Sequence, residues 1–196
     1  MSEHRNRRCL LRWLRSARRR SGLITAATPV TRLADVERLV SELDLTATTT
    51  HAELAAQLST LRGRPIRIQP YPAAFVAEAR RIDEPLPYGV WVPKPAADYV
   101  FFRAETTLTH QRHIILHELG HICCRHVGED AAEAGRAESG EPDHASITSA
   151  VKRAGGFAED QEQAAETFAY LVERQTRPNL SAAGETPAAR YRLLED

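Results

Sequence analysis

The chain has 196 residues, enough for one domain with a substantial core, and its 26 basic and 26 acidic side chains leave no net charge. No apolar run approaches the roughly 20 residues of a transmembrane helix, so no membrane-spanning segment is predicted. The three cysteines, Cys9, Cys123 and Cys124, provide no disulfide framework, and we expect a protein of the reducing cytoplasm.

The charge balance hides an asymmetry at the N-terminus. Residues 1–20 carry eight arginines and one glutamate. Such a segment could form a basic amphipathic helix that binds an anionic membrane or nucleic acid, or act as a transit peptide. Chain ends are usually loosely ordered, so we interpret residues 1–30 as a flexible basic extension and do not favour direct nucleic-acid binding.

The next segments predict two helices and a strand. Apolar residues recur at helical spacing in 32–43. Thr50 and Glu53 form a capping-box pattern that begins a second helix, and this helix runs to Gly63. Alternating apolar side chains in 64–69 then predict a strand.

Two further strands are predicted at 88–92 and 98–102, separated by a turn that contains proline. Together they suggest a hairpin. If 98–102 were an exposed edge of the sheet, an extended substrate could add to it as a further strand. The alternative is an interior strand, because Phe101 and Phe102 are adjacent and would be buried on opposite faces.

The sequence HELGH at 117–121 is the strongest functional signal. In a helix, His117 and His121 lie on one face and can converge on a single metal ion. Glu118 projects from the neighbouring side of the turn, where it can act as a general base. This arrangement is typical of zinc hydrolases, in which two histidines are joined by a third protein ligand and water.

The motif falls within a strongly predicted helix at 109–127. Thr107 or Thr109 can act as the N-cap, and Gly128 is expected after the last turn. The alternative interpretation is a core helix whose histidines are satisfied by neighbouring side chains.

Two further histidines and a cysteine in this helix give weaker indications of their roles. We expect His113, one turn before the motif, to be a surface residue or an outer partner of the site. We expect His126 at the helix end, where a cation suits the helix dipole. Cys124 could approach a metal, but a buried apolar role is favoured.

Residues 128–157 are predicted to form a long loop with a short helix near 146–154, and a loop of this length can act as a lid over a cleft. Residues 158–175 predict a strong amphipathic helix. We place the folded domain at 31–176 and expect 177–196 to be a loose tail.

The helix at 158–175 offers the third metal ligand. Glu162 and Glu166 are four residues apart and share a face with the small residues Ala165 and Ala169, which would allow close packing on the motif helix. We assign Glu162 as the ligand and Glu166 as an acceptor for a ligand histidine, with the reverse assignment as the alternative.

The chain resembles the ImmA/IrrE family of metallopeptidases. The resemblance rests on DYVFF at 98–102, HQRHIILHELGHICCRH at 110–126 and EQAAETFAYLV at 162–172, and it covers about residues 50–175. His117 and His121 match the family's metal ligands and Glu118 its catalytic glutamate. Ala164 stands where many relatives carry a carboxylate.

This resemblance implies an α+β fold with a zincin-like core, in which a small mixed sheet packs on the motif helix and on the second ligand-bearing helix. It also implies a Zn²⁺-dependent endopeptidase acting on a specific protein partner, since some relatives cleave a DNA-binding transcriptional repressor. The alternative is a non-catalytic, metal-binding regulatory protein of a toxin–antitoxin or phage-related system. Candidates for stabilising the oxyanion are Tyr170, His113 and His144.

Overall fold

The computed structural model describes residues 28–126, 140–154 and 156–176. Over these residues the fold is mixed α+β, with six helices and one three-stranded sheet. The helices are α2 (Leu33–Ser41), α3 (His51–Arg62), α4 (Ala73–Arg81), α5 (Leu108–Cys124), α7 (His144–Ala154) and α8 (Glu159–Thr176). The strands are β1 (Ile66–Pro70), β2 (Gly89–Pro93) and β3 (Asp98–Phe102).

Two predicted segments, the basic extension up to residue 27 and the tail from residue 177, lie outside the described residues. Within the part that the structure describes, no helix combines the length and apolar character needed to cross a bilayer.

The sheet has the strand order β1-β3-β2, with β1 parallel and β2 antiparallel to β3. The predicted hairpin of β2 and β3 is therefore confirmed. The expectation of an exposed edge at 98–102 is wrong, because β3 is the central strand. Val100 and Phe101 explain this position, since each is fully buried although they point to opposite faces.

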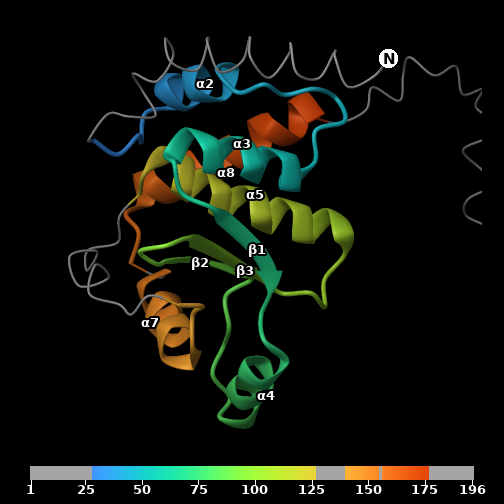
Figure 1. The fold of residues 1–196 in the computed structure, drawn as a ribbon, viewed down its shortest axis with the longest axis vertical. Coiled ribbons are helices and arrows are strands. Elements are labelled where there is room, and N and C mark those ends of the chain that lie inside the picture. Colours follow the sequence, from blue (N-terminus) through green and yellow to red (C-terminus); the bar gives the residue numbers. More distant parts are fainter. Residues whose placement is uncertain (1–27, 127–139, 155, 177–196) are drawn as a thin grey trace, which may run out of the picture.

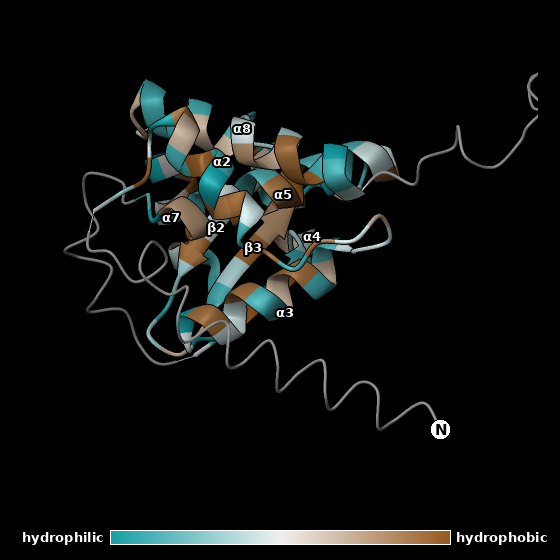
Figure 2. Ribbon diagram, turned by 90° about the horizontal axis from the view of Figure 1, so that it is seen from above, coloured by the Kyte–Doolittle hydropathy of each residue, from teal (hydrophilic) through white to brown (hydrophobic). Residues whose placement is uncertain are grey.

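Helices cover both faces of the sheet (Figure 1). α5 packs against β2 and β3 on one face, where α3, α8 and α2 complete the layer, and α7 packs against β2 on the other face, on which α4 also lies. Apolar segments of α5 and the strands gather at the centre of the molecule (Figure 2). The motif helix α5 is thus packed between the sheet on one side and the other helices of its layer on the other.

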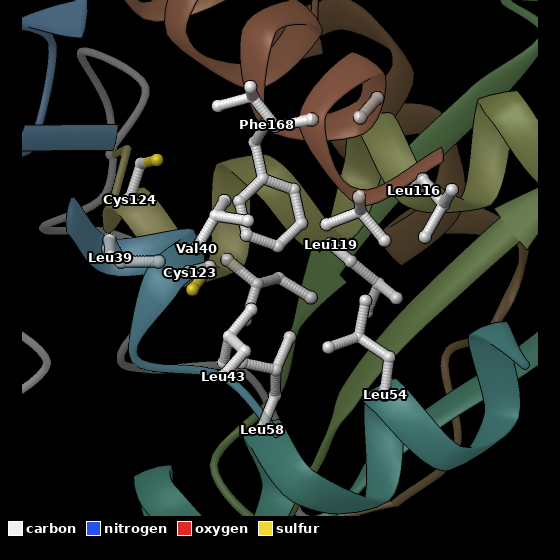
Figure 3. Packing of buried hydrophobic residues seen from close by; sticks show 14 of the residues in the cluster. Leu39, Val40, Leu43, Leu54, Leu58, Leu116, Leu119, Cys123, Cys124 and Phe168 are labelled. Carbon is white, nitrogen blue, oxygen red and sulfur yellow. The ribbon is translucent and has the colours of Figure 1, made fainter. Parts of the chain in front are cut away.

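The larger hydrophobic cluster holds α2, α3 and α8 against α5. Leu54 and Leu58 of α3, Leu119 of α5 and Phe168 of α8 belong to this one cluster (Figure 3). Truncating a fully buried phenylalanine such as Phe168 typically costs about 3–5 kcal/mol. This packing fixes the relative positions of α5 and α8.

A buried charge network ties α5 to the sheet. The carboxylate of Asp98 in β3 is fully buried and forms ion pairs with Arg62 and Arg64. Trp91 Nε1 also donates to it at 2.9 Å. Arg62 in turn donates to the carbonyl of Ile122 at 3.1 Å, so the network reaches the end of the motif helix.

Local signals explain where the helices begin and end. The predicted capping box of Thr50 and Glu53 is confirmed, and Gly63 closes α3 with φ of 66° in the left-handed region. Thr107 caps α5 by accepting from the His110 N–H. α5 ends at Cys124, earlier than predicted, because Arg125 adopts a left-handed conformation. Gly128, the expected stop, lies outside the described residues.

The segment 128–157 was predicted to be a long loop with a short helix, and its residues 128–139 and 155 lie outside the described residues. The helix predicted within it is α7, which is slightly longer than expected. Ile147 and Ala150 of α7 are buried in a second cluster with Val90 and Val92 of β2. This part of the segment is therefore a core element rather than a movable cover. The short helix α4 was not predicted at all.

Candidate metal centre

The two motif histidines converge as their spacing predicts. They lie one turn apart on α5, and their Nε2 atoms are 3.0 Å apart. His121 is buried and His117 is half-buried, and both line the same cleft. For tetrahedral zinc with Zn–N bonds of 2.0–2.1 Å, two ligand nitrogens lie about 3.3 Å apart. The observed separation is close to that value.

Glu162 completes the group from the first turn of α8. Its carboxylate oxygens lie 3.3 Å from His117 Nε2 and 3.7 Å from His121 Nε2. One ligand atom from each of the three residues falls within 4.8 Å of the others. Two imidazoles and a carboxylate around one point form a donor set that fits zinc, and the group could hold a metal ion.

Glycine at position 120 permits this approach of α8. A Cβ atom there would lie 2.9 Å from the carbonyl oxygen of Ala165 and 3.0 Å from its Cα. Ala164, Ala165 and Ala169 are all buried, so small residues on both helices form the contact. The helix backbones therefore come close enough for Glu162 to reach both histidines.

Glu118 lies between the metal group and the sheet. It is only 7 % exposed, and its carboxylate lies against the backbone of β2 at Gly89. Burial raises the pKa of Glu118 to about 7, while the His117 ring opposes this rise. A carboxyl group with such a pKa can both accept and release a proton near neutral pH.

Gly89 of β2 leaves the space that the Glu118 side chain occupies. A Cβ at Gly89 would lie 2.6 Å from Ile114 Cγ2 and 2.9 Å from Glu118 Oε1. The strand therefore contacts the carboxylate through its backbone, and any larger residue would displace it.

Glu166 lies where an outer partner of a ligand histidine is expected. Its Oε2 atom is 3.5 Å from His117 Nδ1 and 3.1 Å from His113 Nε2. His113 also lies 3.3 Å from Glu173 through its Nδ1. Glu166 faces the ring nitrogen of His117 that points away from Glu162, so the geometry favours Glu162 over Glu166 as the third ligand.

His126 was predicted to be a cation at the helix end, and this prediction is wrong. Its side chain is fully buried, and its Nδ1 lies 2.9 Å from His121 Nδ1. The backbone turn at Arg125 causes this placement, since the His126 N–H donates to the His121 carbonyl at 3.0 Å. Burial lowers the pKa of His126, so the ring is neutral at neutral pH.

The ligand histidines have opposite electrostatic surroundings. Burial lowers the pKa of His121 to about 2, with His117 and His126 contributing. Burial also opposes protonation of His117, but the carboxylates of Glu162, Glu118 and Glu166 outweigh it and raise the pKa of this ring. These carboxylates give the site the negative charge that a divalent cation requires.

The metal group opens into a cleft of about 560 Å³. The cleft is also lined by residues 85–89, by Val151 of α7 and by Phe157. Of the three candidates for oxyanion stabilisation, only His113 lines this cleft. Tyr170 is exposed on α8, and the His144 ring packs at a tilt against Phe75, with ring centroids 4.8 Å apart.

Several residues of the site were not predicted from the sequence. Phe157 stacks on the His121 ring, with centroids 4.2 Å apart and planes 20° apart. His126 lies five residues after His121, a spacing that places no two residues on one helix face. Gly89 carries no side-chain signal, and its role depends on the pairing of strands distant from the motif.

The chain was compared with protein-family models, with curated proteins and with solved structures, and none of these comparisons finds a match.

Proposed function

We propose that the chain is a zinc-dependent endopeptidase that cleaves one protein partner. The observation that carries this proposal is the position of Glu118. Its buried carboxylate lies beside a His-His-Glu group, against a strand backbone, and at a cleft open to solvent. A carboxylate with a purely structural role would need neither a neighbouring metal group nor access to a solvent-filled cleft.

The chemistry divides between the ion and the chain. Zinc, when bound, supplies a Lewis acid that polarises a peptide carbonyl and makes water more acidic. His117, His121 and Glu162 would hold it. Glu118 accepts the proton that the attacking water loses and then donates it to the leaving amine. The raised pKa of Glu118 favours both transfers.

The outer edge of β2 is the proposed platform for the substrate. Tyr88 and Lys94 hydrogen-bond to the neighbouring strand segment, at 2.8 and 3.0 Å, so the alternating residues Gly89 and Trp91 direct their backbone groups to the other side. An extended peptide could add there as a strand beside Glu118. This platform replaces the one expected at 98–102.

We further propose that the chain is a peptidase of the ImmA/IrrE type. The HELGH helix, the Glu162 helix and the small mixed sheet support this assignment. A DNA-binding transcriptional repressor is then the first substrate to test. The competing function, a metal-binding regulator without turnover, shares the metal site and differs only in the use of Glu118.

The test compares the wild type with Glu118→Gln, which preserves shape but removes the base. Each protein is expressed in the same cells, and new protein N-termini are identified by mass spectrometry. We expect one or a few new termini with the wild type and none with the variant, which should instead retain the uncut partner. Identical termini with both proteins would exclude the peptidase function.

A further inference from the structure

A line of hydrogen bonds runs from the backbone of Val30 to the metal group. His126 Nε2 lies 2.9 Å from the Val30 carbonyl oxygen, and His126 Nδ1 lies 2.9 Å from His121 Nδ1. Val30 is itself fixed, because its N–H donates to the Cys124 carbonyl at 2.8 Å. The segment before α2 and the end of α5 therefore both hold the His126 ring.

The carbonyl at one end sets the direction of this line. A carbonyl oxygen only accepts, so the hydrogen must be on His126 Nε2. A neutral imidazole carries one ring hydrogen, which leaves His126 Nδ1 as an acceptor. The hydrogen between the two rings must then belong to His121 Nδ1.

This placement determines which nitrogen of His121 can bind a metal. With its hydrogen on Nδ1, the ring presents the lone pair of Nε2. That atom is the one that lies 3.0 Å from His117 Nε2 and 3.7 Å from Glu162. The opposite tautomer would place a hydrogen at the point where the ligands converge.

We propose that His126 is a positioning residue. It donates to the Val30 carbonyl through Nε2 and accepts from His121 through Nδ1, and it thereby holds His121 in the tautomer that can bind a metal. Metal-bound histidines usually donate directly to a carboxylate, a backbone carbonyl or water. Here a second imidazole takes that place. The inference rests on the metal site of the proposed function and does not require peptide hydrolysis.

Phe157 contributes to the orientation of the His121 ring but not to the choice of its tautomer. It stacks on the face of the His121 ring and so fixes the plane of the ring. It offers no acceptor in that plane and therefore cannot select a tautomer. If His126 were only a core residue, an apolar replacement of similar size would leave the tautomer and the metal affinity of His121 unchanged.

The first experiment measures zinc affinity by competition with a chromophoric chelator. We expect His126→Leu to weaken zinc binding by about 10–100-fold, as is typical when an outer partner is lost. His126→Asn retains a side-chain acceptor and should restore part of the affinity. Cys124→Ala is the matched control, since it removes another buried side chain from the same helix end and Cys124 is not part of the metal group.

The second experiment records ring ¹⁵N resonances of the zinc-free wild type by NMR, which requires no variant to fold. We expect hydrogen on Nδ1 of His121 and on Nε2 of His126. The opposite tautomer of His121 would overturn the inference, as would full zinc affinity in His126→Leu. Failure of the wild type to bind zinc would instead contradict the metal site of the proposed function.

Discussion

Gly120 of α5 and Ala165 of α8 meet without space for a side chain, since a Cβ at Gly120 would lie 2.9 Å from the Ala165 carbonyl oxygen. The contact lies between the two motif histidines and opposite the turn of α8 that carries Glu162. Gly120, the residue before His121 in HELGH, therefore controls how closely Glu162 of α8 approaches the two histidines.

Gly120→Ala should weaken zinc binding. In an exposed helix this substitution would stabilise by about 1 kcal/mol, but here the methyl group must push α8 away, at a cost of about 1–3 kcal/mol. Zinc affinity and the melting temperature of the zinc-free protein should both fall. Gly140→Ala is the control, because no atom of the described residues lies within 4 Å of its Cβ position. Unchanged zinc affinity in Gly120→Ala would show that the helix spacing does not set the site.

Glu162→Ala should remove zinc from the protein, whereas Glu166→Ala should only weaken binding, by about 10–100-fold. The reason is that Glu162 faces the Nε2 atoms of both histidines, while Glu166 contacts His117 through Nδ1. Zinc content per chain, measured after dialysis at a fixed free zinc concentration, distinguishes the two. Full zinc content in Glu162→Ala together with loss in Glu166→Ala would reverse the assignment.

Gly89→Ala should lower the rate of cleavage while leaving zinc content near that of the wild type. The added methyl group would displace Glu118, whose Oε1 is 2.9 Å from the Cβ position, and leave the ligands in place. A misplacement of about 1 Å can reduce a rate by about 10²-fold. Zinc content and cleavage are measured on the same sample, and a parallel loss of both would indicate general disruption of the site.

Asp98→Ala should destabilise the fold by about 3–5 kcal/mol, as is typical when one partner of a buried ion pair is removed. The change leaves Arg62 and Arg64 without their shared carboxylate and Trp91 Nε1 without its acceptor. The free energy of unfolding is measured by denaturant titration. Arg38→Ala is the comparison, because its ion pair with Asp35 is exposed and should contribute less than about 1 kcal/mol.

The motif and the helices could be predicted from sequence because their signals are local. The spacing of His117 and His121, the capping box at Thr50 and the apolar stripe of 158–175 all act within a few turns of helix. The convergence of Glu162 on the histidines was also anticipated, since Ala165 and Ala169 indicated a close helix contact.

The remaining features depend on contacts between distant segments. Strand order decided that β3 is interior and that β2 forms the edge beside Glu118, and hydrophobic patterns do not specify strand order. His126 enters the site because Arg125 adopts a left-handed conformation, which is uncommon for arginine. Its partner, Val30, is 96 residues away along the chain.

The most direct test of the account measures cleavage of the identified partner by zinc-loaded wild type and zinc-loaded Glu118→Gln, with zinc content determined on both samples. We expect equal zinc content and a rate lower by about 10²–10⁴-fold in the variant, the usual contribution of a general acid–base group. Equal rates at equal zinc content would contradict the proposal that Glu118 and the His-His-Glu group form a peptidase active site.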